Sequence, residues 1–300
     1  MYLIINLGLK SIRGIVFNNN GEQIFSSSRA VYSKLIGSRV EQDAKEWKSK
    51  LEEILEEIAS IDFLNKKIEY ITSTTSSSCI YGMDIDGSPI TKVMMVSDKR
   101  ASSEAEEIEE IIKTENKSSS LNCPASSIIP KALWYKRNRP ETFQNIKYWV
   151  GAGEFLNHYF TKEVFTDSLN ASKGLYEKGR YLENVIDKVG LSTTSLPEVK
   201  DIGFDLSITD MVRKKYDFSP NCKYVLTTYD AICAVLGSYD GESNTACDVS
   251  GTVTSVRVLS DLGLKEAKGT ILSQKLGNHD KYLIGASNNL GGGIMEWFKQ

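Results

Sequence analysis

Two glycine-containing hairpin turns hold the residues best suited to bind phosphate. The stretch NLGLKS spans residues 6–11 between two apolar strands, and SGTVTS spans residues 250–255 between two later ones. A glycine in a turn lets backbone amides approach a phosphate without a Cβ in the way, and neighbouring hydroxyls can donate hydrogen bonds. Neither stretch matches a Walker A loop or a dinucleotide fingerprint. The candidate phosphate-binding residues are Gly8, Lys10, Ser11, Gly251 and Thr252.

A carboxylate stands where a predicted strand gives way to a predicted helix. Asp230 follows the apolar strand KYVLTT and precedes the small, apolar sequence AICAVLG. A carboxylate at this point can cap the helix by accepting an amide hydrogen bond. At the mouth of an α/β sheet it can instead take a proton from a substrate hydroxyl. The residues alone leave both roles open.

Hydroxyl side chains dominate the run TSTTSSSC, residues 72–79, at the end of another predicted strand. Such a run suits hydrogen bonding to a polyhydroxylated ligand, and it equally suits an exposed turn. Further along, Asp98 and Arg100 in SDKRA form either a salt bridge at a helix start or a ligand contact.

Alternating strands and helices must position these residues. Apolar side chains recur at helical spacing in residues 41–60, which predicts a helix that buries Trp47, Leu51, Ile54, Leu55 and Ile58. A second helix is predicted to start after a cap at Ser102 or Ser103. The segment 196–208, with Pro197 and Gly203, is predicted to be a loop. Other predicted strands are 3–7, 12–17, 23–31, 68–72, 223–228 and a hairpin over 246–260; other predicted helices are 131–138, 150–160 and 229–239. This order predicts an α/β fold.

The bulk composition excludes several classes of protein. The net charge of −3 over 300 residues argues against a nucleic-acid partner. Apolar runs are too short to cross a membrane, and the sequence begins with a strand rather than a signal peptide, so we expect a cytoplasmic protein. The five scattered cysteines, with no CxxC pair, are expected to be reduced thiols.

In combination, these segments resemble the FGGY carbohydrate kinases, in order along nearly the whole chain. YLIINLGLKSIRG is similar to the family's N-terminal D-x-G-T segment, and VEQDAKEW to its E-Q-D-P-x-x-W segment. The stretches DIDGSPITKVMMVSDKRA, ALWYKRNRPE, FTDSLNAS, LPEVKDIG, TTYDAICAVLGS, SGTVTS and NNLGGGIMEW resemble later family motifs.

The resemblance implies an actin-like ATPase fold related to ribonuclease H, with a mixed sheet and flanking helices. Residues 1–243 would form the sugar-binding N-terminal domain, and 244–300 the beginning of an incomplete nucleotide-binding domain. ATP and Mg²⁺ are the implied cofactors. By position, Asp230 falls on the general base, which also binds substrate, and Arg13 joins the phosphate-binding residues. Asp98 is expected among the residues that bind the substrate.

Departures from the family pattern also carry information. Asn6 occupies the place of a carboxylate associated with Mg²⁺, and an amide lacks the charge that a hard cation prefers. Leu9 and Lys10 stand where the family has a pair of threonines, so the hydroxyls of that pair are lost and a cation is gained. The segment TSSSC, residues 75–79, is closer to ribulokinase-like and xylulose-kinase-like members, which suggests a ketopentose bound by Ser76 and Ser77.

Two functions therefore remain open. The first is ATP-dependent phosphorylation of a sugar hydroxyl, probed by its dependence on Asp230. The second is a catalytically weak or inactive family member that binds a sugar or a protein partner, which Asn6, Leu9 and the early end of the second domain favour. A homodimer, or another chain that supplies the missing part, is the protein partner these observations allow.

Overall fold

The computed structural model describes residues 1–62, 64–116, 119, 121–239, 245–250, 254–264, 271–276, 281–288, 291 and 298. The chain divides into two compact units, Met1–Tyr229 and Asp230–Gln300. This division falls before helix α9 (Asp230–Ser238), whereas the domain boundary expected from the sequence, between residues 243 and 244, falls after it.

A six-stranded mixed sheet forms the centre of the first unit, in the order β14–β15–β6–β1–β2–β3. Its strands are β1 (Tyr2–Leu7), β2 (Ser11–Phe17), β3 (Gln23–Ala30), β6 (Tyr70–Thr75), β14 (Asp205–Ser207) and β15 (Lys223–Val225). β1 and β15 run parallel to β6, and the pairs β1–β2, β2–β3 and β14–β15 are antiparallel. The predicted strands 3–7, 12–17 and 23–31 are confirmed. The expected end of the fourth strand at Thr72 is wrong, because β6 continues into the hydroxyl run.

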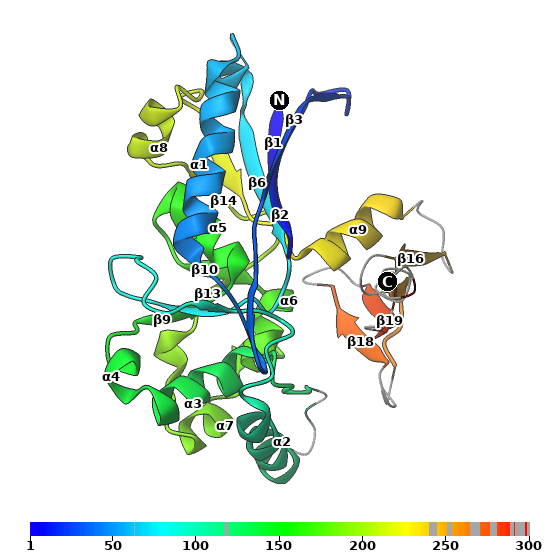
Figure 1. The fold of residues 1–300 in the computed structure, drawn as a ribbon. Coiled ribbons are helices and arrows are strands. Elements are labelled where there is room, and N and C mark those ends of the chain that lie inside the picture. Colours follow the sequence, from blue (N-terminus) through cyan, green and yellow to red (C-terminus); the bar gives the residue numbers. More distant parts are fainter. Residues whose placement is uncertain are drawn as a thin grey trace. The chain divides into compact units, whose positions relative to one another are not determined.

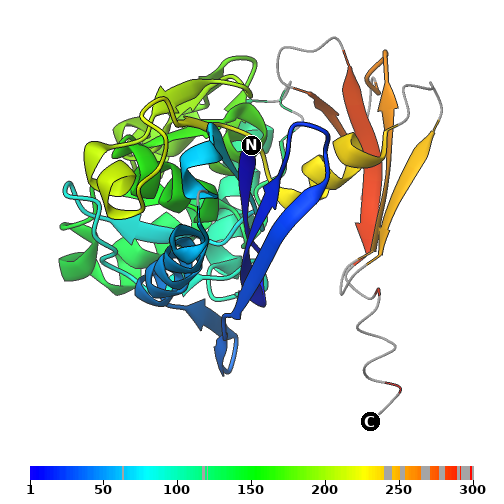
Figure 2. The same ribbon diagram turned by 90° about the horizontal axis from the view of Figure 1, so that it is seen from above.

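Two helices cover one face of this sheet. α1 (Ala44–Ser60) contacts β2 and β3, and α5 (Ala152–Thr161) contacts β6 and β15. Figure 2 shows the helices of this unit gathered on one side of the blue strands β1–β3. The Asp43 carboxylate caps α1 by accepting from the Lys45 amide. The five apolar residues predicted to face inward from α1 are all buried, which confirms the helical pattern.

A second apolar cluster lies among α2 (Ser102–Glu115), α3 (Ile128–Asn138) and α7 (Glu183–Lys188). These three helices are at the bottom of Figure 1. The predicted serine cap of α2 is wrong, since the helix begins at Ser102 itself and Ala101 occupies the cap position. The predicted loop at 196–208 is also wrong: β13 (Glu198–Lys200) pairs with β10 (Phe165–Asp167), and β14 pairs with β15.

Shorter elements complete the first unit. They are β4 (Lys34–Ile36), β5 (Arg39–Gln42), η1 (Asn65–Lys67), β7 (Tyr81–Met83), β8 (Val93–Met94), α4 (Pro140–Phe143), β9 (Tyr148–Val150), α6 (Ser168–Ala171), η2 (Ser172–Gly174), β11 (Tyr176–Glu177), β12 (Arg180–Tyr181), η3 (Thr193–Ser195) and α8 (Asp210–Lys215). None of the helices in the described part of the chain has the length and apolar character needed to cross a bilayer.

The second unit contains α9 and an antiparallel sheet in the order β16–β17–β19–β18. Its strands are β16 (Ala246–Ser250), β17 (Thr254–Ser260), β18 (Leu272–Lys275) and β19 (Tyr282–Asn288). β16 and β17 confirm the predicted hairpin over 246–260. The turn between them, with Gly251 and Thr252, lies outside the described residues.

Candidate functional site

Three strands of the central sheet end at one edge. Because β1, β6 and β15 run parallel, their carboxyl ends lead into the Gly8 turn, the hydroxyl run and the segment 226–229 respectively. The Ser76 amide donates to the Leu7 carbonyl over 3.0 Å, which brings the first hairpin and the hydroxyl run side by side. The carboxyl edge of an open α/β sheet is the usual place for a ligand.

The first hairpin is a tight turn whose charged residues face solvent. The Gly8 amide donates to the Ser11 carbonyl over 2.9 Å, and the side chains of Lys10 and Arg13 are exposed. A Cβ built on Gly8 would meet nothing closer than the Ser11 carbonyl oxygen, 3.6 Å away. Packing within the described residues therefore does not require glycine here.

A buried glutamine, Gln42, hydrogen-bonds to the backbone of this hairpin. Gln42 Nε2 donates to the Leu9 carbonyl over 2.8 Å and to Ser33 Oγ over 3.0 Å, while its Oε1 accepts from Trp47 Nε1 over 2.7 Å. The sequence showed Gln42 only as part of the EQD segment, because its three partners lie in three separate stretches of chain. Gln42 fixes the backbone that precedes Lys10.

Asn6 lies at the carboxyl end of β1, below the Gly8 turn. Its Nδ2 donates to the Thr74 carbonyl over 3.4 Å, and its Oδ1 lies 3.8 Å from the Cβ position of Gly8. Mg²⁺ is held by one or two carboxylates together with substrate phosphates. Residues 6–11 of this hairpin contain neither Asp nor Glu. The residues of this hairpin therefore do not fit a Mg²⁺ bound by the protein itself.

Two adjoining pockets occupy the edge beyond the hydroxyl run. Thr75, Gly153, Glu154 and Asn170 line both of them. The first is completed by Ser76, Ser77, Ser78, Ile80, Ile128, Gly151, Ala152, Thr166, Ala171, Lys173, Tyr181 and Pro197, and the second by Ser73, Asn157, Asp167, Leu226, Thr227 and Thr228. Hydroxyl, amide and charged groups thus share the walls with a few apolar side chains. The structure brings Ser76 and Ser77, both singled out in the sequence, to this cavity.

Asp167 ties two walls of the second pocket together, and sequence reasoning missed it. Its carboxylate accepts from Leu169 N over 2.9 Å, from Asn170 Nδ2 over 2.6 Å and from Thr228 Oγ1 over 2.9 Å. Burial raises its pKa, although these hydrogen bonds act in the opposite direction. The only signal was the segment TDSLNAS, whose polar residues follow a short apolar stretch.

Glu154 is the second buried acid of the cavity. Its Oε2 accepts from the Gly151 amide over 2.7 Å, which closes the first turn of α5. Burial raises the pKa of Glu154 above its ordinary value. Asp167 and Glu154 are therefore best understood as acids that shape the pocket walls.

The segment that leads to Asp230 is fixed by hydroxyl hydrogen bonds. Thr228 donates to Asp167, and Thr227 Oγ1 donates to the Ser73 carbonyl of β6. Asp230 follows two residues after Thr228 and is the first residue of α9, in the second unit. Its Oδ1 accepts from the Ala231 amide over 2.7 Å, as expected for an acid at a helix start.

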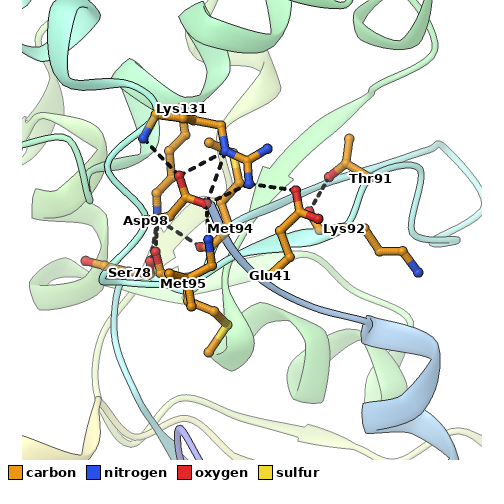
Figure 3. A network of polar contacts seen from close by, with 10 residues as sticks. Glu41, Ser78, Thr91, Lys92, Met94, Met95, Asp98 and Lys131 are labelled. Atoms are coloured by element: carbon orange, nitrogen blue, oxygen red, sulfur yellow. Dashed lines mark hydrogen bonds and ion pairs between the residues drawn. The ribbon is translucent and has the colours of Figure 1, made fainter. Parts of the chain in front are cut away.

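Asp98 forms the salt bridge that was one of its two expected roles. Its side chain is fully buried, pairs with Arg100 Nη2 at 2.6 Å and accepts from the Val40 amide over 2.8 Å. Burial alone would raise the pKa of Asp98, but the hydrogen bonds from Arg100 and the Val40 amide hold it below its usual range. Figure 3 shows this carboxylate inside a network that includes Glu41. Since Asp98 does not line either pocket, the structure favours the salt bridge over a ligand contact.

The mixed central sheet and the helices that cover it define an actin-like ATPase fold. Residues 1–236 match the model of the N-terminal domain of the FGGY family of carbohydrate kinases. The chain belongs to this family.

Curated relatives include sugar kinases at low identity. The chain is 23% identical over 262 residues to a xylulose kinase of Staphylococcus epidermidis, which covers 84% of this chain and 52% of that protein. It is 24% identical over 213 residues to an autoinducer-2 kinase of Yersinia enterocolitica, covering 67% of this chain and 40% of that protein. The chain thus spans about half the length of the xylulose kinases it matches.

Solved structures share the fold. A ligand-bound xylulose kinase from Lactobacillus acidophilus superposes with a TM-score of 0.88 at 19% identity, covering 100% of this chain and 62% of that one. A gluconate kinase from the same organism gives 0.87 at 19% identity, with the same coverage. Glycerol kinase of Plasmodium falciparum, with ADP, gives 0.82 at 18% identity, covering 99% and 63%. These likenesses confirm the expected fold.

Proposed function

We propose that the protein transfers the γ-phosphate of ATP to a hydroxyl of a sugar, and that the sugar is a ketopentose such as ribulose or xylulose. The observation that carries the proposal is the polar cavity beside the Gly8 hairpin, with Ser76 and Ser77 on its wall. Hydroxyl and amide side chains at this position match a polyhydroxylated substrate. Membership of a family of carbohydrate kinases supports the reaction type.

In this proposal, Asp230 takes the proton from the attacking sugar hydroxyl. Lys10, Ser11 and Arg13 orient the phosphate, and Gly251 and Thr252 are further candidate phosphate-binding residues. Holding both reactants in one geometry supplies much of the rate gain in such transfers. Mg²⁺ enters with ATP as part of the substrate, since the residues of the first hairpin do not hold it.

A non-catalytic sugar-binding protein is the second candidate. Asn6 favours it, because an amide lacks the charge that a hard cation prefers. Sugar binding and sugar-dependent ADP release by the 300-residue chain separate the two candidates. Sugar binding together with ADP release supports a kinase, and sugar binding alone supports the second candidate. The absence of both signals contradicts both candidates.

The charge of the pocket tests the substrate class. Lys173 lines the first pocket, with its Nζ 5.8 Å from the centre of the Tyr229 ring. An ammonium at the wall would favour an anionic sugar such as gluconate over a neutral ketopentose. For a ketopentose substrate, we expect Lys173→Met to change the Kd for D-xylulose or D-ribulose by less than about threefold, because a neutral sugar carries no charge for the ammonium to attract.

Calorimetric titration of the chain with D-xylulose, D-ribulose and D-gluconate measures this effect. Lys200→Met is the matched control, because Lys200 also lies over an aromatic ring, that of Phe204, but outside the pocket lining. Preferential binding of gluconate that falls more than about tenfold in Lys173→Met would overturn the ketopentose assignment. It would assign an aldonate instead.

A further inference from the structure

A lysine ammonium lies fully buried behind the first pocket. Lys131, on α3, has no exposed side-chain surface, and its Nζ donates to the carbonyls of Ser78 (2.7 Å), Met94 (2.9 Å) and Met95 (3.1 Å). An ammonium has three N–H donors, so these three carbonyls use them all. Burying a charge is costly, and its acceptors here are neutral carbonyls rather than a carboxylate. Such a residue requires a specific reason for its position.

One of the three carbonyls belongs to a strained turn. Ser78 has φ of 63°, in the left-handed region that a non-glycine residue enters only with backbone strain. The turn is fixed on one side by the Ser76 amide on Leu7 O, at 3.0 Å. On the other side, Ile80 and Met94 exchange two backbone hydrogen bonds of 3.0 and 2.8 Å. Lys131 holds the middle of the turn (Figure 3).

The hydroxyl-bearing residues of this turn face the pocket. Ser76, Ser77 and Ser78 all line it, and Ile128, one helical turn before Lys131, lines it from α3. Lys131 itself is not among the residues that line the pocket, and its ammonium links the turn to β8 and Met95.

We propose that Lys131 is a positioning residue of the sugar site: it holds the left-handed turn at Ser78 and thereby fixes the hydroxyls of Ser76 and Ser77 at the pocket wall. The assignment of the pocket to a sugar rests on the proposed function. The hold on the turn itself does not.

The first test is Lys131→Met in the 300-residue chain, followed by amide hydrogen exchange and by calorimetry with D-xylulose and D-ribulose. We expect exchange at Ser76 and Ile80 to accelerate at least about tenfold relative to the amides of β3, and the sugar Kd to rise about tenfold. Lys136→Met is the matched control. Lys136 lies on the same helix and also donates to carbonyls, those of Val189 and Gly190, but it does not line either pocket. It should change neither quantity.

A rescue experiment separates positioning from general support of the core. Glycine enters the left-handed region without strain, so Ser78→Gly should restore part of the lost protection at Ser76 in the Lys131→Met background. Equal acceleration throughout the first unit, with no recovery by glycine, would overturn the proposal. If protection behaves as expected and the wild-type chain binds no sugar, the proposed function fails and the role of Lys131 in the turn stands.

The wild-type chain offers a test that needs no substitution. Burial lowers the pKa of Lys131 to about 8, and Cys79, Asp98 and Arg100 are the other groups that act on it. Above this pH the neutral amine has two N–H groups for three carbonyls. We therefore expect the protection at Ser76, and sugar affinity with it, to fall as pH rises through about 8, after correction for the intrinsic pH dependence of exchange. Cys79→Ser removes the neighbouring thiol as the titrating group. A profile that is flat from pH 7 to 9.5 would contradict the proposal.

Deprotonation of Lys131 is expected to lower the protection of the turn, but it has the opposite effect on the free energy of unfolding. The pKa of Lys131 is lowered from 10.5 to about 8, so the unfolded chain binds more protons between these values. The contribution of Lys131 to the free energy of unfolding therefore increases with pH across this window. Loss of turn protection alongside an unchanged or increased contribution to stability distinguishes local release of the turn from unfolding.

Discussion

Replacing Asp230 by alanine is expected to lower the kcat of sugar phosphorylation by about two to four orders of magnitude, the usual contribution of a general base. The sugar Kd should change by less than about threefold, because the pocket lining described for the first unit does not include Asp230. Thr227 and Thr228, which line the second pocket just before Asp230, should keep their own hydrogen bonds in this variant. Coupled ADP release measures kcat, and calorimetry measures sugar binding.

Two further variants distinguish a base from a helix cap. Asp230→Asn keeps an oxygen that can accept from the Ala231 amide but removes the proton acceptor, so it should be nearly as inactive as the alanine variant. Asp210→Ala is the matched control, because Asp210 is also the first residue of a helix, α8, and is exposed. It should retain activity. Full activity in Asp230→Asn would mean that the carboxylate serves the helix and that the base lies elsewhere.

Asn6→Asp is expected to raise Mg-ATP-dependent phosphorylation by about one to three orders of magnitude, at roughly 1.4 kcal/mol for each tenfold. The substitution supplies a carboxylate, which a hard cation prefers, at the end of β1. It also removes the donor to the Thr74 carbonyl and places a negative oxygen near it. We therefore expect a loss of stability of about 1 kcal/mol without the metal.

Thermal unfolding with and without Mg²⁺ and ATP provides a readout that does not depend on turnover. Addition of Mg-ATP should raise the Tm of Asn6→Asp more than that of the wild-type chain. Asn20→Asp, in the exposed turn after β2, is the control for added charge. The Asn6→Asp variant could bind sugar and nucleotide but gain neither activity nor a larger Tm shift with Mg-ATP. In that case, Asn6 does not limit metal binding or phosphorylation at this site.

The elements predicted best from the sequence are those whose pattern is local. The first three strands and α1 follow from period-two and helical spacing, and the buried face of α1 was identified residue by residue. The segment 196–208 was misjudged because β13 and β14 owe their existence to partners elsewhere in the chain, β10 and β15. Pro197 and Gly203 correctly indicated breaks in regular structure, but they did not indicate the short strands β13 and β14 beside them.

The site follows the same division. The hydroxyl run and the first hairpin could be predicted because each is a contiguous stretch at a strand end. Asp167 could not, since its role comes from Thr228, a residue distant in the chain. In the sequence, nothing distinguishes Lys131 from the other basic residues of its helix. Only the fold reveals that carbonyls from two separate segments surround its ammonium.

The hydrogen bonds of Gln42 give the first hairpin an optical reporter. One carboxamide joins the Leu9 carbonyl to the indole N–H of Trp47, and that indole is buried. Any displacement of Leu9 moves the group that accepts from the indole and changes the polarity around the fluorophore. Tryptophan emission should therefore respond when a phosphate-bearing ligand reaches the hairpin. A Trp47→Phe variant, which leaves the other three tryptophans in place, identifies the part of the signal that comes from this residue.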